Sequence, residues 1–314
     1  ITEKKGQFYF DTKARQLIMD NKGAVEGIRA ETSDGLIDFK GRVVFATGGY
    51  AANKEMLEMY IGPDADESWY RGNPTNTGDG HNMAKEAGAG LVRMGGTNSM
   101  VIGMVSPENT SAGNPSYVLH FGICINAKGE RYTDEGLMYG KACPALFDQP
   151  GQVAAIVFDE GSRAKNGALA NIVKQYETNN IPYYQPDTLE ELAEKIKMPN
   201  EAFMKTINDF NAAVTGDKAL NVTPQKTAFA MKLEKAPYYA FANLVPGITL
   251  TFGGININGN AQVMQPDGRI IKGLYAAGEC AGGVFHYEYF PVGLPCANAL
   301  TMGRIAGRSA AEKL

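Results

Sequence analysis

The chain has 314 residues, of which 44% are hydrophobic and 37 are glycine, and its formal net charge is −4. This length suggests two domains, and the composition is typical of an α/β protein with many turns. The charge, with no basic stripe, argues against nucleic-acid binding, and no apolar run is long enough to span a membrane.

The four cysteines stand singly in the sequence: Cys124, Cys143, Cys280 and Cys296. Zinc and iron–sulfur sites formed by one segment need closely spaced ligands such as CxxC. We therefore expect no metal site formed by this segment alone.

The first hundred residues predict short strands followed by one helix. We expect strands over residues 7–10, 24–30 and 43–46, and the last of these runs into a Gly48-Gly49 turn in the sequence RVVFATGGY. The run TGDG then opens a helical pattern that ends at Gly88. Either Thr77 or Asp79 could cap this helix.

The sequence pattern changes in the middle of the chain. The run ICINAKGERYTDE over residues 123–135 predicts a strand, a turn at Lys128-Gly129 and an arginine–aromatic pair, and a second strand is expected over residues 153–158. Residues 188–197 and 201–214 repeat apolar side chains at helical spacing, so two amphipathic helices should contribute core stripes there.

Near the C-terminus the sequence is again rich in glycine. The run GLYAAGE over residues 273–279 predicts a buried strand that delivers Glu279 at its carboxyl end, and a small-residue helix follows over residues 298–307. Ligands of open α/β sheets bind at the carboxyl ends of strands, and helix N-termini offer N–H groups to phosphates. This arrangement favours a dinucleotide site.

Four of these runs carry a family resemblance: RVVFATGGY, TGDG, ICINAKGERYTDE and GLYAAGE. In this order they resemble the FAD-dependent fumarate reductase and 3-ketosteroid dehydrogenase superfamily. The resemblance implies an α/β fold in which a partial FAD-binding, glutathione-reductase-like domain contains an inserted α+β capping domain. We expect the FAD-binding parts over residues 1–102 and 244–314, and the capping domain over residues 103–243. No GxGxxG turn lies near the N-terminus, so we expect the ADP-binding βαβ unit to lie in a preceding segment of a longer flavoprotein.

The resemblance also implies which residues hold a non-covalent FAD, with Glu279 on the ribityl or neighbouring hydroxyls. The full expected set is Thr47, Gly48, Gly49, Asp79, Glu279, Leu294, Pro295 and Cys296. Without the ADP-binding segment, this chain should bind FAD weakly or not at all, and should be inactive by itself.

The charged groups that grip a dicarboxylate in fumarate reductases are replaced at the matching positions. The proton-donating arginine corresponds to Tyr139, a substrate-binding histidine to Leu250 and a second arginine to Phe290. A dianion at such a site would be uncompensated, at a cost of several kcal/mol. The resemblance therefore favours an apolar substrate, with Phe252 and Tyr287 as further contacts.

The 3-ketosteroid dehydrogenases have tyrosines at the positions of Tyr139 and Tyr289, and the second stands four residues before a glycine, here Gly293. The resemblance implies that Tyr289 and Gly293 hold a carbonyl oxygen while Tyr139 exchanges a proton with carbon. Two neutral donors suit a developing enolate oxygen. A tyrosine chosen at random, by contrast, is usually a half-buried packing residue.

The expected function is that of an FAD-dependent oxidoreductase acting on CH–CH bonds. Hydride would pass between flavin N5 and the carbon β to the carbonyl of an apolar ketone or enone, steroid-like or an unsaturated lactone, with an unidentified electron donor or acceptor. One alternative is a reductase of a small unsaturated carboxylate of the fumarate or arylacrylate type, in which Arg131 or another cation meets the acid. A non-catalytic packing or interaction module is a further alternative.

Overall fold

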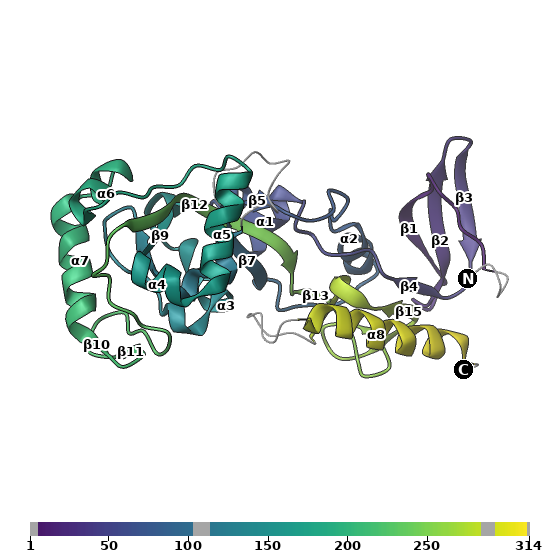
Figure 1. The fold of residues 1–314 in the computed structure, drawn as a ribbon. Coiled ribbons are helices and arrows are strands. Elements are labelled where there is room, and N and C mark those ends of the chain that lie inside the picture. The colour runs from purple at the N-terminus through teal and green to yellow at the C-terminus, as the bar shows by residue number, and fades with distance from the viewer. Residues whose placement is uncertain (1–5, 103–113, 284–292, 313–314) are drawn as a thin grey trace. The chain divides into compact units, whose positions relative to one another are not determined.

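The computed structural model describes residues 6–102, 114–283 and 293–312, and the chain divides into two compact units (Figure 1). Unit 1 comprises Ile1–Pro63, Asn73–Thr97 and Leu250–Leu314, and unit 2 comprises Asp64–Gly72 and Asn98–Thr249. Each unit contains its own cluster of buried apolar side chains. The mixture of helices and sheets confirms the expected α/β class.

Unit 1 begins with an antiparallel meander of β1 (Lys13–Met19), β2 (Val25–Thr32) and β3 (Gly35–Lys40), labelled in Figure 1. The strand expected over residues 7–10 is wrong. Phe8, Tyr9 and Phe10 are 57%, 56% and 82% exposed and belong to no described strand. Their aromatic content is typical of strands, but pairing with β2 begins only at Lys13.

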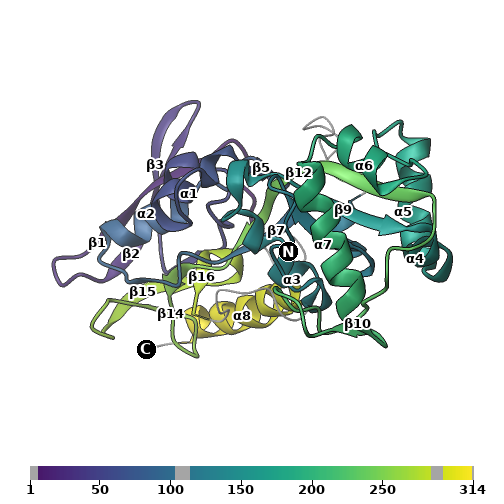
Figure 2. The same cartoon turned by 90° about the vertical axis from the view of Figure 1, so that its left-hand side faces the viewer.

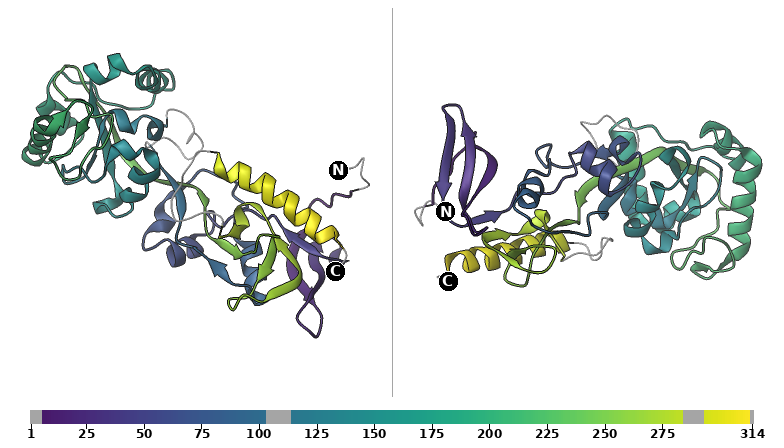
Figure 3. Two further views of the ribbon diagram at one scale, coloured as in Figure 1. Left: turned by 90° about the horizontal axis from the view of Figure 1, so that it is seen from below. Right: turned by 180° about the vertical axis from the view of Figure 1, so that it is seen from behind.

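A second sheet of unit 1 joins distant parts of the sequence. β4 (Val43–Phe45) pairs in parallel with β15 (Ile270–Ala276), which pairs antiparallel with β14 (Gln262–Met264). The long helix α8 (Leu294–Ala311) packs against β15 and β4, as Figure 3 shows. The helix expected over residues 298–307 is therefore confirmed but starts four residues earlier.

The remaining elements of unit 1 are short. They are α1 (Lys54–Tyr60), α2 (Asp79–Glu86), β6 (Leu91–Val92), β13 (Gly254–Asn256) and β16 (Ala281–Gly282). The expected side-chain cap of α2 is wrong, because Gly78 occupies the cap position with φ 77° and no side chain caps the helix. Asp79 is instead the first helical residue, where its charge favours the helix dipole.

Unit 2 is built on a sheet in the order β5 (Trp69–Tyr70), β12 (Tyr238–Thr251), β9 (Ala154–Asp159) and β8 (Ile123–Asn126), and β7 (Thr97–Ile102) also pairs with β12. Helices α6 (Leu189–Lys195) and α7 (Asn200–Ala213) cover one face, where Phe203 and Ile207 pack on Ile125 and Val157 (Figure 2). Successive strand residues point to opposite faces of a sheet, and on the other face Phe241 of β12 packs against Tyr176 of α5 (Gly167–Thr178).

The strand over residues 153–158 and the two amphipathic helices are confirmed as β9, α6 and α7. The turn at Lys128-Gly129 is also confirmed, with Gly129 at φ 81°. Helices α4 (Glu160–Lys165) and α5 were not predicted, and the short elements α3 (Tyr139–Ala142), β10 (Val214–Thr215) and β11 (Lys218–Ala219) complete the unit.

No helix in the described parts of the chain is long and apolar enough to cross a bilayer. The same residues contain no group of three metal-ligating side chains, and none of the four cysteines forms a disulfide there.

Candidate functional site

Two parallel strands of unit 1 deliver their following turns to one sheet edge. The register pairs Ala276 of β15 with Phe45 of β4, so the segment after Phe45 and the segment after Ala276 emerge side by side. The first segment is Thr47–Gly49, and the second carries Glu279 in a short 3₁₀ turn. This is the edge at which open α/β sheets bind ligands.

Glu279 is fixed by donors from separate segments. Its Oε1 accepts a hydrogen bond from the Thr251 N–H at 3.0 Å, and Oε2 accepts one from Asn76 Nδ2 at 3.4 Å. Burial raises the pKa of this carboxyl, although hydrogen bonds from Thr251 and Gly49 oppose the rise. A Cβ atom at Gly49 would clash with the Glu279 carboxylate and the Thr251 hydroxyl, so any other residue there would displace these side chains.

A cavity of about 200 Å³ lies beside Glu279. Its lining consists of Leu250, Thr251, Glu279, Pro295, Cys296, Asn298 and Ala299. The amino end of α8 borders it, and no side chain caps that helix end, where Gly293 has φ 86°. Asn298 is only 6% exposed, and its Nδ2 has no hydrogen-bond partner among the described residues. Helix N–H groups and this amide are therefore suited to donate to a ligand.

These residues fit a ligand rich in hydroxyl and carbonyl oxygens. The Glu279 carboxylate can accept hydrogen bonds from hydroxyls, while Asn298 and the helix end can donate to carbonyl oxygens. A ribityl chain and the polar edge of a flavin have this chemistry. Asn298 was missed in the sequence, although its position in the first turns of a predicted ligand-facing helix was a usable indication.

Thr47 and Asp79 do not line the Glu279 cavity. The Thr47 side chain lies against Gly80 in the first turn of α2, where a Cβ atom would clash with its hydroxyl. Asp79 accepts a hydrogen bond from the Thr77 hydroxyl at 2.9 Å and is paired with Lys13 at 3.5 Å. Their role toward FAD stays a prediction.

In unit 2, Tyr139 is the first residue of α3 and is 6% exposed. Its ring lies edge-on to that of Tyr117, with centroids 5.6 Å apart and planes at 80°. Tyr117 is 55% exposed, so the pair joins a buried phenol to a solvent-facing one. Sequence reasoning gave no role to Tyr117.

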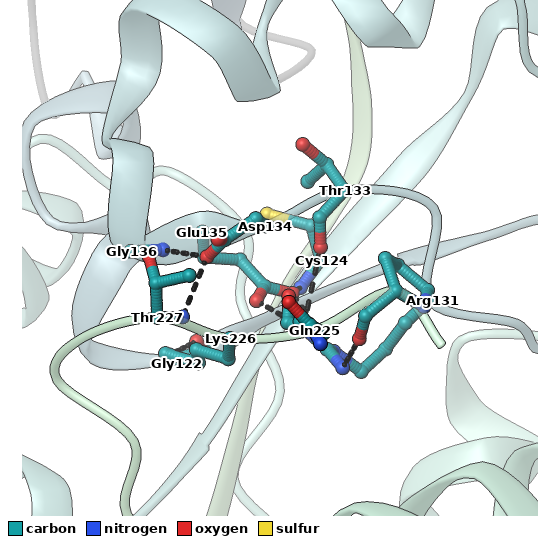
Figure 4. A network of polar contacts seen from close by, with 11 residues as sticks. Gly122, Cys124, Arg131, Thr133, Asp134, Glu135, Gly136, Gln225, Lys226 and Thr227 are labelled. Atoms are coloured by element: carbon teal, nitrogen blue, oxygen red, sulfur yellow. Dashed lines mark hydrogen bonds and ion pairs between the residues drawn. The ribbon is translucent and has the colours of Figure 1, made fainter. Parts of the chain in front are cut away.

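The turn before Tyr139 is held by the buried polar network of Figure 4. Arg131 donates to both carboxylate oxygens of Glu135, from Nη2 to Oε2 at 2.6 Å and from Nε to Oε1 at 3.1 Å. Glu135 also accepts from the Cys124 N–H at 2.8 Å, and Lys226 donates to the Gly122 carbonyl. This network fixes the Glu135–Leu137 turn, and Tyr139 follows it.

The same network decides what Arg131 can do. Its side chain is 2% exposed, and Nη1 donates to the Pro224 carbonyl at 2.6 Å. An arginine with these partners is not available to the acid group of a substrate, so the role considered for Arg131 is wrong.

The structure describes only some of the other residues expected to contact the substrate. Leu250 lines the Glu279 cavity, Phe252 is 1% exposed, and Gly293 is the exposed residue before α8. Tyr287, Tyr289 and Phe290 lie outside the described residues.

Comparison with known proteins gives a consistent result. Residues 1–289 match a family described as an FAD binding domain. The chain is 35% identical to the NADH:acrylate oxidoreductase of Vibrio harveyi over 329 residues, which cover 99% of this chain and 31% of that protein.

Two solved structures share the fold. A flavocytochrome c3 fumarate reductase in its open conformation is 31% identical with a TM-score of 0.69, and the match covers 96% of this chain and 51% of that chain. A 3-ketosteroid Δ1-dehydrogenase from Sterolibacterium denitrificans, solved with 1,4-androstadiene-3,17-dione, is 24% identical with a TM-score of 0.81. This match covers 99% of this chain and 61% of that chain. The chain thus spans less than two thirds of each of these three proteins.

The cavity beside Glu279 can accept hydrogen bonds from hydroxyl groups and donate them to carbonyl groups. This chemistry agrees with the family match, which covers most of the chain. The chain therefore belongs to the FAD-binding family that includes fumarate reductases and 3-oxosteroid dehydrogenases, and FAD is its cofactor.

Proposed function

We propose that this chain carries part of the active site of an oxidoreductase that acts on the C–C bond next to a carbonyl group. FAD, when bound, supplies the acceptor or donor of a hydride at the carbon β to the carbonyl. Tyr139 moves the proton at the α carbon, and Tyr289 with Gly293 holds the carbonyl oxygen.

The position of Tyr139 carries this proposal. A general acid needs a fixed orientation and limited access to water. Tyr139 has both, because it is 6% exposed and begins a helix directly after the turn fixed by Arg131 and Glu135. In the reducing direction its phenol donates a proton to the α carbon, and solvent restores that proton.

Replacing Tyr139 by phenylalanine in the full-length protein removes the hydroxyl and keeps the ring. We expect turnover to fall by about 100-fold or more, the usual contribution of general acid–base catalysis, while substrate binding changes little. Tyr117→Phe is the matched control, because it removes a neighbouring phenol to which the reaction assigns no proton. Unchanged turnover of Tyr139→Phe would refute the assignment.

Two substrate classes fit this reaction. A neutral enone, ketone or unsaturated lactone agrees with the apolar replacements Leu250 and Phe252 and with the buried state of Arg131. An unsaturated monocarboxylate is the second candidate, and the acrylate and fumarate reductases among the similar proteins favour it.

Reoxidation of the reduced flavin by different substrates separates these classes. Stopped-flow mixing of the reduced full-length protein with fumarate, a cinnamate and a neutral steroid enone compares them directly. We expect fumarate to be slow, because two carboxylates need more cationic partners than the site residues supply. Fast reoxidation by fumarate would contradict the apolar character assigned to the site.

A further inference from the structure

The buried amide of Asn298 interrupts an apolar face of α8. Met302, Ile305 and Ala306 follow it at spacings of four, seven and eight residues, so all four side chains lie on one face of the helix. The three apolar members pack against Tyr275 of β15 or its neighbours. Asn298 is 6% exposed and is the polar member of this face. Burying an amide without a partner destabilises a fold, so packing does not account for an asparagine at this position.

The side chain of Asn298 faces a space that can hold a ligand. It lines the cavity of about 200 Å³ beside Glu279, together with Pro295 and Ala299 of the same helix. These three helical residues are spaced i, i+3 and i+4 and therefore share a face. The Nδ2 atom of Asn298 is shielded from water and has no hydrogen-bond partner among the described residues. A ligand atom in the cavity can accept a hydrogen bond from it.

The backbone of α8 offers this cavity few donors. The N–H groups of the first helical turn have no partner in a preceding turn. Helical bonding begins at Ala297, which donates to the carbonyl of the residue before the helix at 3.1 Å. Of the three helical residues before it, Pro295 has no N–H, so only Leu294 and Cys296 can donate from the backbone. A side-chain amide in the next turn adds a donor that the helix end lacks.

The lining of the cavity also determines how negative charge can be stabilised there. Glu279 is the one charged side chain in the lining, and no lysine, arginine or histidine belongs to it. The ribityl chain of FAD is attached beside the N1–C2 carbonyl edge of the flavin ring, so a ribityl hydroxyl on Glu279 brings that edge toward the same cavity. Reduction of FAD increases the negative charge on this edge, and nearby hydrogen-bond donors tune the flavin through it.

We propose that Asn298 raises the reduction potential of the bound FAD by donating its amide N–H to the carbonyl oxygen at the N1–C2 edge of the flavin ring. A hydrogen bond to a charged acceptor is stronger than one to a neutral acceptor, so the amide binds the reduced form more tightly than the oxidised form. Asn298 itself moves no proton. This assignment rests on the FAD-dependent reaction proposed above and concerns its driving force.

The test measures the midpoint potential of FAD in the full-length protein, by reductive titration against a reference dye. Asn298→Leu keeps a similar volume and removes the donor. Hydrogen bonds to charged and to neutral acceptors differ by about tenfold in affinity, so the preference for reduced over oxidised FAD should fall by about this factor. For a two-electron couple, tenfold corresponds to about 30 mV, and the midpoint potential should fall by that amount.

Thr301→Val is the matched control, because it replaces an exposed polar side chain of the same helix by an apolar one of similar size, and the potential should not change. Asn298→Ala removes the donor without added bulk and should reproduce the fall seen with leucine, while Asn298→Gln keeps the amide and should recover part of it. An unchanged potential in Asn298→Leu and Asn298→Ala would overturn the proposal, and so would equal weakening of both forms of FAD. Tyr139→Phe should lower turnover without changing the potential, so failure of the proposed reaction and failure of this assignment give different results.

Discussion

The buried ion pair between Arg131 and Glu135 gives the sharpest stability prediction. The two side chains are 2% and 0% exposed, and their contact is bidentate. In Arg131→Met, Glu135 would lose both guanidinium hydrogen bonds and keep the one from the Cys124 N–H. Removing one partner of a buried pair costs about 3–5 kcal/mol, because the remaining charge is uncompensated. We expect the lower end, about 3 kcal/mol, since Lys226 also exerts an electrostatic attraction on Glu135.

Urea unfolding followed by tryptophan fluorescence measures this effect. Trp69 is the single tryptophan of the chain and lies in unit 2, so its emission reports on the unit that contains the pair. With a slope of about 2–3 kcal/mol per M, the urea midpoint should fall by about 1–1.5 M.

Two further variants make the test specific. Arg163→Met removes the same charge from a pair that is 34% and 28% exposed, and should cost at most about 1 kcal/mol. The double variant Arg131→Met/Glu135→Leu removes both charges of the pair and should recover part of the loss, because the buried Lys226 and the Cys124 N–H then lose Glu135 as a partner. Equal midpoint shifts for Arg131→Met and Arg163→Met, or no recovery in the double variant, would refute the reasoning.

Two other predictions concern unit 1. Burial lowers the pKa of His81 to about 4, below its ordinary value of 6.5, so the unfolded chain binds the proton first and stability is lost as pH falls from 6.5 toward 4. This group should account for about 3 kcal/mol, and His81→Leu should flatten the pH dependence of unfolding followed by far-ultraviolet circular dichroism. Gly49→Ala should weaken FAD binding in the full-length protein, measured by flavin fluorescence, because its Cβ atom would displace Glu279 and Thr251. Gly259→Ala is the control, since no atom lies within 4 Å of a Cβ there, and equal weakening in both variants would count against the role of Glu279.

Local patterns in the sequence were sufficient where one segment decides its own structure. Helices α6 and α7 follow from apolar side chains at helical spacing, and β9 follows from a short apolar run. Glu279 could be assigned to a strand end because the run GLYAAGE contains both the strand and its glycine-rich exit. The family resemblance, now confirmed, extended these patterns to the cofactor.

Contacts between distant segments could not be obtained in this way. The strand expected over residues 7–10 failed because a strand needs a partner, and β2 pairs only from Lys13. The ion pair of Arg131 is with Glu135, only four residues away, but the burial of Arg131 depends on Pro224 and on the sheet of unit 2.

The sequence by itself therefore determined the class of fold and the strand end that carries Glu279, because both depend on short runs with a fixed periodicity or turn. Its resemblance to a known family indicated the cofactor. Tertiary structure alone decided which charged side chains have buried internal partners, as Arg131 has in Glu135. Burial and hydrogen-bond partners set the availability of a charge, and both arise from segments that are remote in the chain.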